Sequence, residues 1–316
     1  PPVIATLLAE IYGPDAASCG VRIDGFRADY LDRFDLPNFR RVIARGNRAR
    51  GMHPVFPTIT FPNHYSLVTG LYPEHHGVVE NSFFDPVRNA PFSFRDPLTA
   101  TDGSWYGGEP IWVTAERQGM VAACFFWPGS DADVKGIRAT YWNRYDGSIP
   151  NVRRIETVLG WLRLPDERRP HVITLYFSDV DSASHRGALS GSDVAASVKA
   201  VDTAPGVLLD GLERLENRDR VLLMLTSDHG MADTGSVRIV QLGDLIDTTG
   251  LRVGFSGPVT ALHVSPEAGT PAAVRDRLNT KLQHGRAYLR VEVPERHHFR
   301  DTPRGGDVVV IMEEGW

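Results

Sequence analysis

Short apolar runs alternate with longer amphipathic stretches along this chain. The clearest run, 220–226, is followed by a Ser-Asp-His-Gly turn and predicts a buried strand. Similar runs predict further strands at 3–8, 19–23, 121–127 and 171–177. The strand at 19–23 is weak, because Gly20 and Arg22 dilute its apolar pattern.

Helical periodicity fills the stretches between these strands. It predicts helices at 28–34, 36–45, 110–118, 152–162 and 193–215. Pro205 predicts a kink in the last of these helices, because proline removes a backbone donor. Strands that alternate with helices predict an α/β fold with a mostly parallel central sheet and helices on both faces.

Several segments have a weaker pattern. Residues 49–56 and 78–84 are expected to be extended, and 86–108 is rich in Pro, Gly, Asp and Ser, as in a surface excursion. The segments 241–246, 271–283 and 288–293 predict a helix and strands to which the pattern assigns no role. We expect one catalytic α/β domain over 1–316, with an excursion at about 86–150.

The stretch 58–70 predicts a short helix with a hydroxyl at its start. Pro62 fits the first turn, where a missing N–H costs nothing, and Gly70 ends the helix. Thr60 is therefore placed at or next to the N-cap, where unpaired N–H groups favour phosphate or an oxyanion. Its hydroxyl is either a plain helix cap or an activated nucleophile.

The amino-acid composition indicates an ordinary globular protein. A chain of 316 residues with 42% hydrophobic and 23% charged residues is typical of a globular protein with a large core. A net charge of −5 gives no indication of nucleic-acid binding. No stretch approaches the roughly 20 apolar residues that span a bilayer. Cys19 and Cys124 permit one bridge or two free, buried thiols.

Three predicted strands are each followed by candidate metal ligands. Asp24 follows the strand 19–23, Asp181 and His185 follow 171–177, and Asp228-His229 follows 220–226. Each alone fits a turn or a helix cap. Together they indicate one rim, because ligands of open α/β sheets bind at the carboxyl ends of the strands. Asp and His suit Zn²⁺, and paired ions can hold both the attacking and the leaving oxygen of an in-line displacement.

Other polar and aromatic residues have two interpretations each. Asn81 precedes a turn, where it serves the backbone or donates to a phosphoryl oxygen. Phe61 belongs to the core or forms a wall for a flat group. Trp142 and Tyr145 are core or surface aromatics, or part of a clamp for a base.

Five motifs resemble the nucleotide pyrophosphatase/phosphodiesterase family of the alkaline phosphatase superfamily, and bacterial members in particular. They are Asp24-Gly25-Phe26-Arg27, Thr60-Phe61-Pro62-Asn63-His64, the segment 70–77, the pair Asp181 and His185, and the segment 227–231. The resemblance covers roughly residues 20 to 315. It implies a three-layer α/β sandwich of the alkaline phosphatase type.

The resemblance also implies two zinc ions and a threonine nucleophile. One ion is expected on Asp24, Thr60, Asp228 and His229, and the other on Asp181, His185 and a further histidine. Thr60 is the expected nucleophile, and Asn81 is expected to help stabilise the phosphoryl oxygens. The expected substrate contacts are Phe61, Asn81, Tyr145 and Tyr176.

The expected reaction is hydrolysis of nucleotide phosphodiesters and pyrophosphates through a nucleotidyl-threonine, with release of a nucleoside 5′-monophosphate. The expected partner is a small nucleotide and not a nucleic acid. The family implies a periplasmic or secreted enzyme; no signal peptide is visible, although the start at Pro1-Pro2 is compatible with a removed one.

One family motif is absent. The last zinc histidine of the family lies in a Gly-x-His-Gly motif downstream of a segment that resembles 303–316, and this sequence has no such motif. We therefore expect the C-terminal end of the family domain to be missing and the second zinc site to lack one ligand. Two alternatives stay open: a related phosphomonoesterase or phosphonate hydrolase, and an inactive protein that binds metal or nucleotide.

Overall fold

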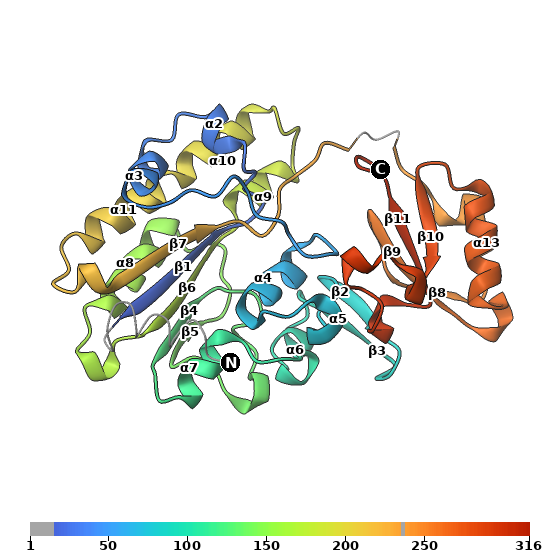
Figure 1. Ribbon diagram of the computed structural model, residues 1–316, viewed down its shortest axis with the longest axis horizontal. Coiled ribbons are helices and arrows are strands. Elements are labelled where there is room, and N and C mark those ends of the chain that lie inside the picture. The colour runs from blue at the N-terminus through green and yellow to red at the C-terminus, as the bar shows by residue number, and fades with distance from the viewer. Residues whose placement is uncertain (1–15, 235–237) are drawn as a thin grey trace. The chain divides into compact units, whose positions relative to one another are not determined.

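The computed structural model describes residues 16–234 and 238–316, in two compact units (Figure 1). Of the described residues, 16–54 and 109–231 form the first unit, and 55–108, 232–234 and 238–316 form the second. The strand expected at 3–8 lies outside the described residues. The single domain expected from the sequence stays a prediction.

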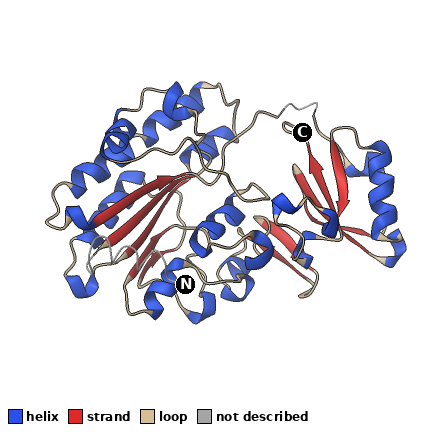
Figure 2. Ribbon diagram, in the orientation of Figure 1, coloured by secondary structure: helices blue, strands red, loops and turns tan. Residues whose placement is uncertain are grey.

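A parallel sheet forms the centre of the first unit (Figure 2). Every pairing within it is parallel, which confirms the predicted sheet type. Its order is β5-β4-β6-β1-β7, which places β1 between β6 and β7. The strands are β1 (Ala17–Ile23), β4 (Ala122–Phe125), β5 (Tyr141–Asn143), β6 (Val172–Phe177) and β7 (Val221–Thr226).

Helices cover this sheet because its strands are apolar on both faces. The alternate residues Cys19, Val21 and Ile23 of β1 enter a large core that α8, α10 and α11 help to build. On the sheet, α7 packs against β4 and β6. The helices are α2 (Tyr30–Arg33), α3 (Pro37–Arg45), α7 (Ile111–Arg117), α8 (Asn151–Leu162), α9 (Asp179–Ser184), α10 (Ser192–Val201) and α11 (Thr203–Leu212).

The helix expected over 193–215 is two helices rather than one kinked helix. α10 ends at Val201 and α11 begins at Thr203. Pro205 explains the break, because in a continuous helix its ring would clash with the carbonyl oxygen of Val201, four residues earlier. Asp202 at the junction accepts hydrogen bonds from the N–H groups of Asn38 (3.1 Å) and Phe39 (2.8 Å) in α3.

The two cysteines are free and buried, so the alternative of a bridge is wrong. Cys19 lies in β1 and Cys124 in β4, and β6 separates these strands. Burial raises the pKa of each thiol to about 12. Neither thiol is therefore a reactive thiolate at neutral pH.

The second unit contains a helical part and two antiparallel sheets. Its helices are α4 (Thr60–Thr69), α5 (Pro73–His76), α6 (Pro97–Ala100), α12 (Leu242–Leu245) and α13 (Pro271–Lys281). The hairpin joins β2 (Ser82–Asp85) to β3 (Ala90–Ser93). The other sheet has the order β10-β11-β9-β8, from β8 (Leu251–Phe255), β9 (Val259–Val264), β10 (Gly285–Leu289) and β11 (Val308–Met312).

The sequence-based prediction does not assemble this four-stranded sheet, although its segment 288–293 overlaps β10. Its strands are short and include polar residues, such as Arg252 in β8 and Arg286 in β10. Its core includes residues of α13, such as Val274 and Leu278. Residues 86–108, expected as a surface excursion, include β3, α6 and the buried Phe92 and Trp105.

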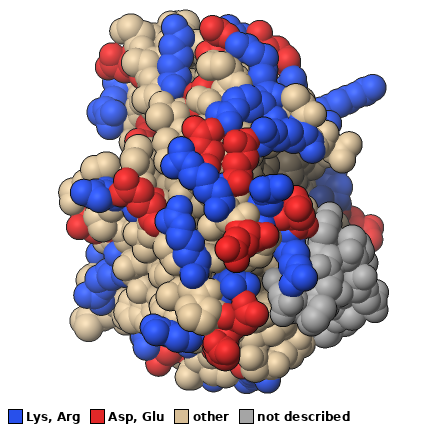
Figure 3. Space-filling model, turned by 90° about the vertical axis from the view of Figure 1, so that its left-hand side faces the viewer, with Lys and Arg blue, Asp and Glu red and all other residues tan. Residues whose placement is uncertain are grey.

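Charges of both signs are mixed on the face shown in Figure 3. In the first unit, Arg41 and Arg45 of α3 pair with Asp210 and Glu213, at the end of α11. Exposed pairs of this kind contribute little to stability, so the packing of α3 depends more on Asp202. In the part of the chain that the structure describes, no helix has the length and apolar character to cross a membrane.

We predict that Asp202→Ala lowers the free energy of unfolding by about 2 kcal/mol, because two N–H groups of α3 lose a charged acceptor. Urea denaturation measures the change. Asp219→Ala is the control, since the Asp219 side chain is 90% exposed. Equal effects of the two substitutions would contradict the role of Asp202.

Candidate active site

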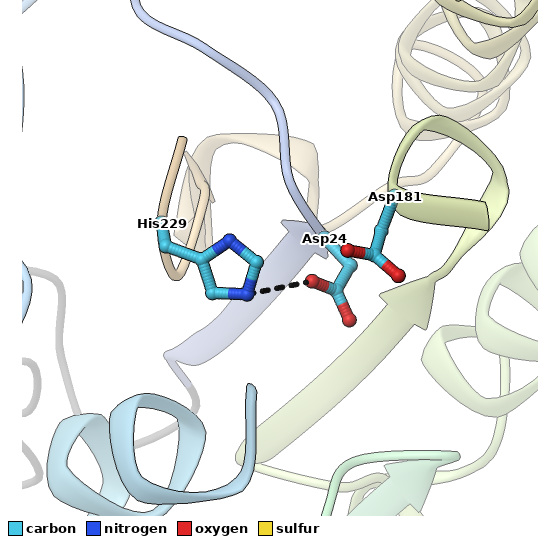
Figure 4. Close-up of side chains that lie close together, drawn as sticks. All are labelled: Asp24, Asp181 and His229. Atoms are coloured by element: carbon cyan, nitrogen blue, oxygen red, sulfur yellow. Dashed lines mark ion pairs between the residues drawn. The ribbon is translucent and has the colours of Figure 1, made fainter. Parts of the chain in front are cut away.

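Two carboxylates and an imidazole meet in the first unit (Figure 4). One ligand atom from each of Asp24, Asp181 and His229 lies within 4.8 Å of the others. His229 Nε2 is 3.4 Å from Asp24 Oδ1 and 3.2 Å from Asp228 Oδ2. Four residues from three separate sequence motifs therefore lie together.

The sheet explains why these residues meet. Asp24 directly follows β1, α9 with Asp181 follows β6, and Asp228-His229 follows β7. These are neighbouring parallel strands, so their carboxyl ends reach the same edge. The N–H of Asp181 donates to the carbonyl oxygen of Asp24 at 3.1 Å, which ties α9 to the end of β1.

Gly25 permits the close approach of these segments. Its φ is +66°, in the left-handed region, and a Cβ there would lie 3.0 Å from the Cα of Asp181. Its N–H donates to Asp228 Oδ1 at 3.1 Å. Asp24-Gly25 therefore both supplies a carboxylate and holds another in place.

Tyr176 contacts the centre of the cluster. Its hydroxyl donates to Asp24 Oδ2 at 2.6 Å, and the residue is only 8% exposed. Burial and the charge of Asp24 raise the pKa of Tyr176, which keeps the hydroxyl protonated as a donor. This geometry makes Tyr176 a positioning residue for Asp24, while its contact with substrate stays a prediction.

The electrostatics of the cluster favour a cation. Burial and the charges of Asp228 and Asp181 raise the pKa of Asp24, and burial raises the pKa of Asp181. Oδ1 of each of these carboxylates is buried and accepts no hydrogen bond from any described residue. Carboxylate and imidazole donors suit zinc, so the residues fit the ion that the sequence predicts.

His185 lies beside this cluster. It ends α9 four residues after Asp181, so the two side chains share one face of the helix. His185 Nε2 is 3.3 Å from Asp181 Oδ1, and the imidazole is 70% exposed. This pair could supply two ligands to a second ion.

Thr60 is the first residue of α4, in the second unit. Ile59 occupies the N-cap, with extended backbone and no hydrogen bond from its side chain. Thr60 is therefore next to the cap position, within the range that the sequence predicts, and its role stays a prediction. Gly70 ends α4 with a φ of 68°, as predicted.

Asn81 is bonded to the residue after Thr60. Its Oδ1 accepts the N–H of Phe61 at 2.9 Å, and its carbonyl accepts the N–H of Phe94 at 3.0 Å. With Oδ1 used in this way, the amide NH₂ is oriented as a donor. The ring of Phe61 lies against Phe94, at 5.4 Å between centroids.

Tyr145 is an exposed aromatic residue of the first unit. It is 52% exposed, its hydroxyl is 3.1 Å from Ser178 Oγ, and its ring is 5.3 Å from that of Phe126. Trp142 is 40% exposed, with Arg138 over its ring. Both aromatics are therefore at the surface rather than in the core.

Two buried residues near these groups were missed by sequence reasoning. Arg22 looks like a polar interruption of a strand, yet it is 0% exposed. Glu80 precedes Asn81, whose N–H donates to Glu80 Oε1 at 2.8 Å. The signal for both was a charged residue inside a segment expected to be extended, at 19–23 and 78–84.

Comparison with known proteins decides the family. The family model described as type I phosphodiesterase / nucleotide pyrophosphatase matches residues 19–316. The chain belongs to this family. The resemblance to this family inferred from the sequence motifs is thereby confirmed, and the particular similarity to bacterial members stays a prediction.

Curated members of the family align with most of the chain. Human ectonucleotide pyrophosphatase/phosphodiesterase family member 1 is 38% identical over 304 residues, which are 93% of this chain and 33% of the relative. A venom phosphodiesterase from Macrovipera lebetinus is 36% identical, over 93% of this chain and 35% of the relative. The chain thus spans about a third of the length of these relatives.

Solved structures confirm the fold. Murine ectonucleotide pyrophosphatase/phosphodiesterase 5 aligns with a TM-score of 0.89 and 30% identity, over 95% of this chain and 79% of the murine chain. An inactive threonine-to-alanine form of that murine protein, in complex with AMP, aligns equally well. The fold is therefore the alkaline-phosphatase-like α/β fold that the resemblance implied.

We predict that Tyr176→Phe weakens zinc binding roughly 10-fold, because Asp24 loses the donor that orients it. Isothermal calorimetry measures the affinity. Tyr141→Phe is the matched control in β5, since that hydroxyl donates to the carbonyl of Arg168. Unchanged affinity in Tyr176→Phe would show that the hydrogen bond does not position the carboxylate.

We predict that Glu80→Gln stabilises the protein at pH 8 but not at pH 5. Burial raises the pKa of Glu80 from 4.5 to about 7, so folding above pH 7 must bury its charge. The free energy of unfolding therefore falls by up to about 3 kcal/mol as the pH rises from the pKa of Glu80 in the unfolded chain through its pKa in the folded protein. The amide of glutamine avoids this cost.

Thermal unfolding at the two pH values measures the effect of Glu80→Gln. Glu267→Gln, at an exposed position, serves as the control. A difference between the Glu80 variant and the parent chain that is the same at both pH values would refute the prediction.

Proposed function

We propose that this chain hydrolyses nucleotide phosphodiesters and pyrophosphates through a covalent nucleotidyl-threonine. The observation that carries the proposal is the cluster of Asp24, Asp181 and His229, whose oxygen and nitrogen donors suit zinc. Family membership supports the same chemistry.

The ligand sets follow the family pattern. Asp24, Thr60, Asp228 and His229 would hold one zinc ion, and Asp181 and His185 would supply two ligands to a second. Bound zinc would lower the pKa of a coordinated hydroxyl and neutralise charge that develops on the phosphoryl oxygens.

Thr60 is the proposed nucleophile. Its oxygen forms a bond to phosphorus and loses its proton, and the bond to the leaving-group oxygen breaks. Water then cleaves the threonine ester and releases a nucleoside 5′-monophosphate. The position of Thr60 at the first residue of α4 supports this role, since helix N-termini favour phosphate.

Asn81 is proposed to stabilise the phosphoryl oxygens. Its Oδ1 is engaged by the N–H of Phe61, which leaves the amide NH₂ as a donor for an oxyanion. The same hydrogen bond restrains the backbone directly after Thr60. Asn81 would thus act on both the nucleophile's helix and the phosphate.

The proposed substrate is a nucleotide, with Phe61 and Tyr145 stacking on its base. The exposed ring of Tyr145 supports this role, since stacking on a base is worth roughly 1–3 kcal/mol. The AMP complex of the murine relative supports a nucleoside monophosphate as the product.

The second zinc site is proposed to be the weaker of the two, because this chain offers it only Asp181 and His185 by family pattern. His297 and His298 are the other candidates for the third ligand, but both rings are engaged elsewhere. The ring of His297 lies 4.4 Å from that of Phe56, and the ring of His298 lies 3.9 Å from that of Tyr72, between centroids. We also propose a location outside the cytoplasm, as the names of the ecto- and venom enzymes suggest.

Hydrolysis of the p-nitrophenyl ester of thymidine 5′-monophosphate tests the proposal. Thr60→Ala should lower turnover roughly 10³-fold or more, because the attacking oxygen is removed. Mass spectrometry after acid quenching should find the nucleotide attached to a peptide containing Thr60 in the parent chain only.

Thr69→Ala is the matched control at the other end of α4, where the hydroxyl donates to the carbonyl of Tyr65. It should keep the parent turnover. Full turnover by Thr60→Ala would exclude the nucleophile, and faster hydrolysis of p-nitrophenyl phosphate than of the diester would favour a phosphomonoesterase. No turnover with zinc bound would indicate an inactive binding protein.

A further inference from the structure

Arg22 is a buried guanidinium in the parallel sheet. It lies in β1, two positions before Asp24, and is 0% exposed. Its register neighbours are Tyr176 in β6 and Thr226 in β7. It therefore lies between the two strands that lead to Asp181 and Asp228.

The hydrogen bonds of Arg22 are incomplete. Nη2 donates to the carbonyl oxygen of Ser227 at 2.7 Å, directly before Asp228. Nε and Nη1 are buried and have no hydrogen-bond partner among the residues that the structure describes. The guanidinium also lies over the ring of Trp127, 5.3 Å from its centroid.

A second buried arginine in the same unit shows the contrast. Arg154 is 2% exposed, but its Nε donates to the carbonyl of Ile149 and its Nη1 to that of Tyr176, each at 2.9 Å. Backbone oxygens thus compensate the burial of Arg154. Arg22 has one such oxygen and needs another source of stabilisation, since an uncompensated buried charge is costly.

The carboxylates of Asp24, Asp181 and Asp228, here called the acidic cluster, are that source. Arg22 keeps its charge at neutral pH, because a guanidinium is not deprotonated in proteins. Its Nη2 donates to the carbonyl oxygen directly before Asp228, and the charges of Asp228 and Asp24 stabilise the cation. The attraction is mutual: the guanidinium offsets the repulsion between carboxylates that are themselves 0–1% exposed.

A divalent cation must bind this cluster in the presence of that fixed positive charge. We propose that Arg22 is an internal counter-cation of the acidic cluster, which stabilises the metal-free first unit and weakens the affinity of the cluster for divalent cations. The inference rests on the proposed function only in taking zinc as the ion.

Three substitutions separate the charge of Arg22 from its shape and its hydrogen bond. Arg22→Met removes the charge and approximates the volume, Arg22→Gln removes the charge but keeps a donor, and Arg22→Lys keeps the charge. Arg154→Gln is the matched control, since the charges of Asp24, Asp181 and Asp228 are not among those that shift its pKa.

Two quantities are measured on the full chain at pH 8, where protons compete least for the carboxylates. One is the Zn²⁺ dissociation constant, by competition with a chelating dye. The other is the melting temperature in excess chelator and again in excess zinc.

The two neutral variants should bind zinc about 10-fold more tightly than the parent chain, an effect of the size that residues behind metal ligands commonly have. Their melting temperatures should fall in chelator and recover in zinc. Arg22→Lys should bind zinc as the parent does. Arg154→Gln should melt lower in both conditions without any change in zinc affinity.

Neutral variants that bind zinc as weakly as the parent, or more weakly, would overturn the inference. Tighter binding by Arg22→Lys would overturn it too, since the charge would not be the cause, as would neutral variants that fail to fold even in zinc. A parent chain that binds no zinc would instead refute the metal site of the proposed function, before any variant is compared.

Discussion

The burial of Asp24 and Asp228 at the carboxyl ends of β1 and β7 is the constraint on which the site depends. Asp24 and Asp228 are 1% and 0% exposed, and burial together with the charge of Asp228 raises the pKa of Asp24. Buried charges of one sign require compensation. The chain supplies part of it through the hydroxyl of Tyr176, the N–H of Gly25 and the guanidinium of Arg22. The remaining buried oxygens, on Asp24 and Asp181, are suited to a cation.

The parallel sheet and the gathering of its strand-end motifs could be anticipated from sequence, because both follow from local patterns. Apolar runs identify β6 and β7, and topology brings the residues after parallel strands to one edge. The roles of Tyr176 and Arg22 could not be anticipated. Each depends on the register of β1 against its neighbours, which pairs Arg22 with Tyr176, and a strand pattern carries no register.

Tertiary packing explains what was missed in the second unit. Strands β8, β9 and β11 are five or six residues long, and their core includes residues of α13 that come from a different part of the sequence. Propensity is too weak to identify such strands without that cover. The predicted kink at Pro205 is wrong for a local reason. Pro205 lies in the first turn of α11, where a proline marks the start of a new helix and does not bend an existing one.

Anomalous X-ray diffraction at the zinc edge, on crystals of the chain grown with zinc, tests the account most directly. The account predicts a strong anomalous peak from a zinc ion that lies about 2.0–2.2 Å from ligand atoms of Asp24 and His229. A weaker peak at Asp181 and His185 would fit the missing family ligand. Zinc found only on exposed histidines such as His75, with Asp24 and His229 unoccupied, would contradict the claim that the buried carboxylates are built to hold a metal ion.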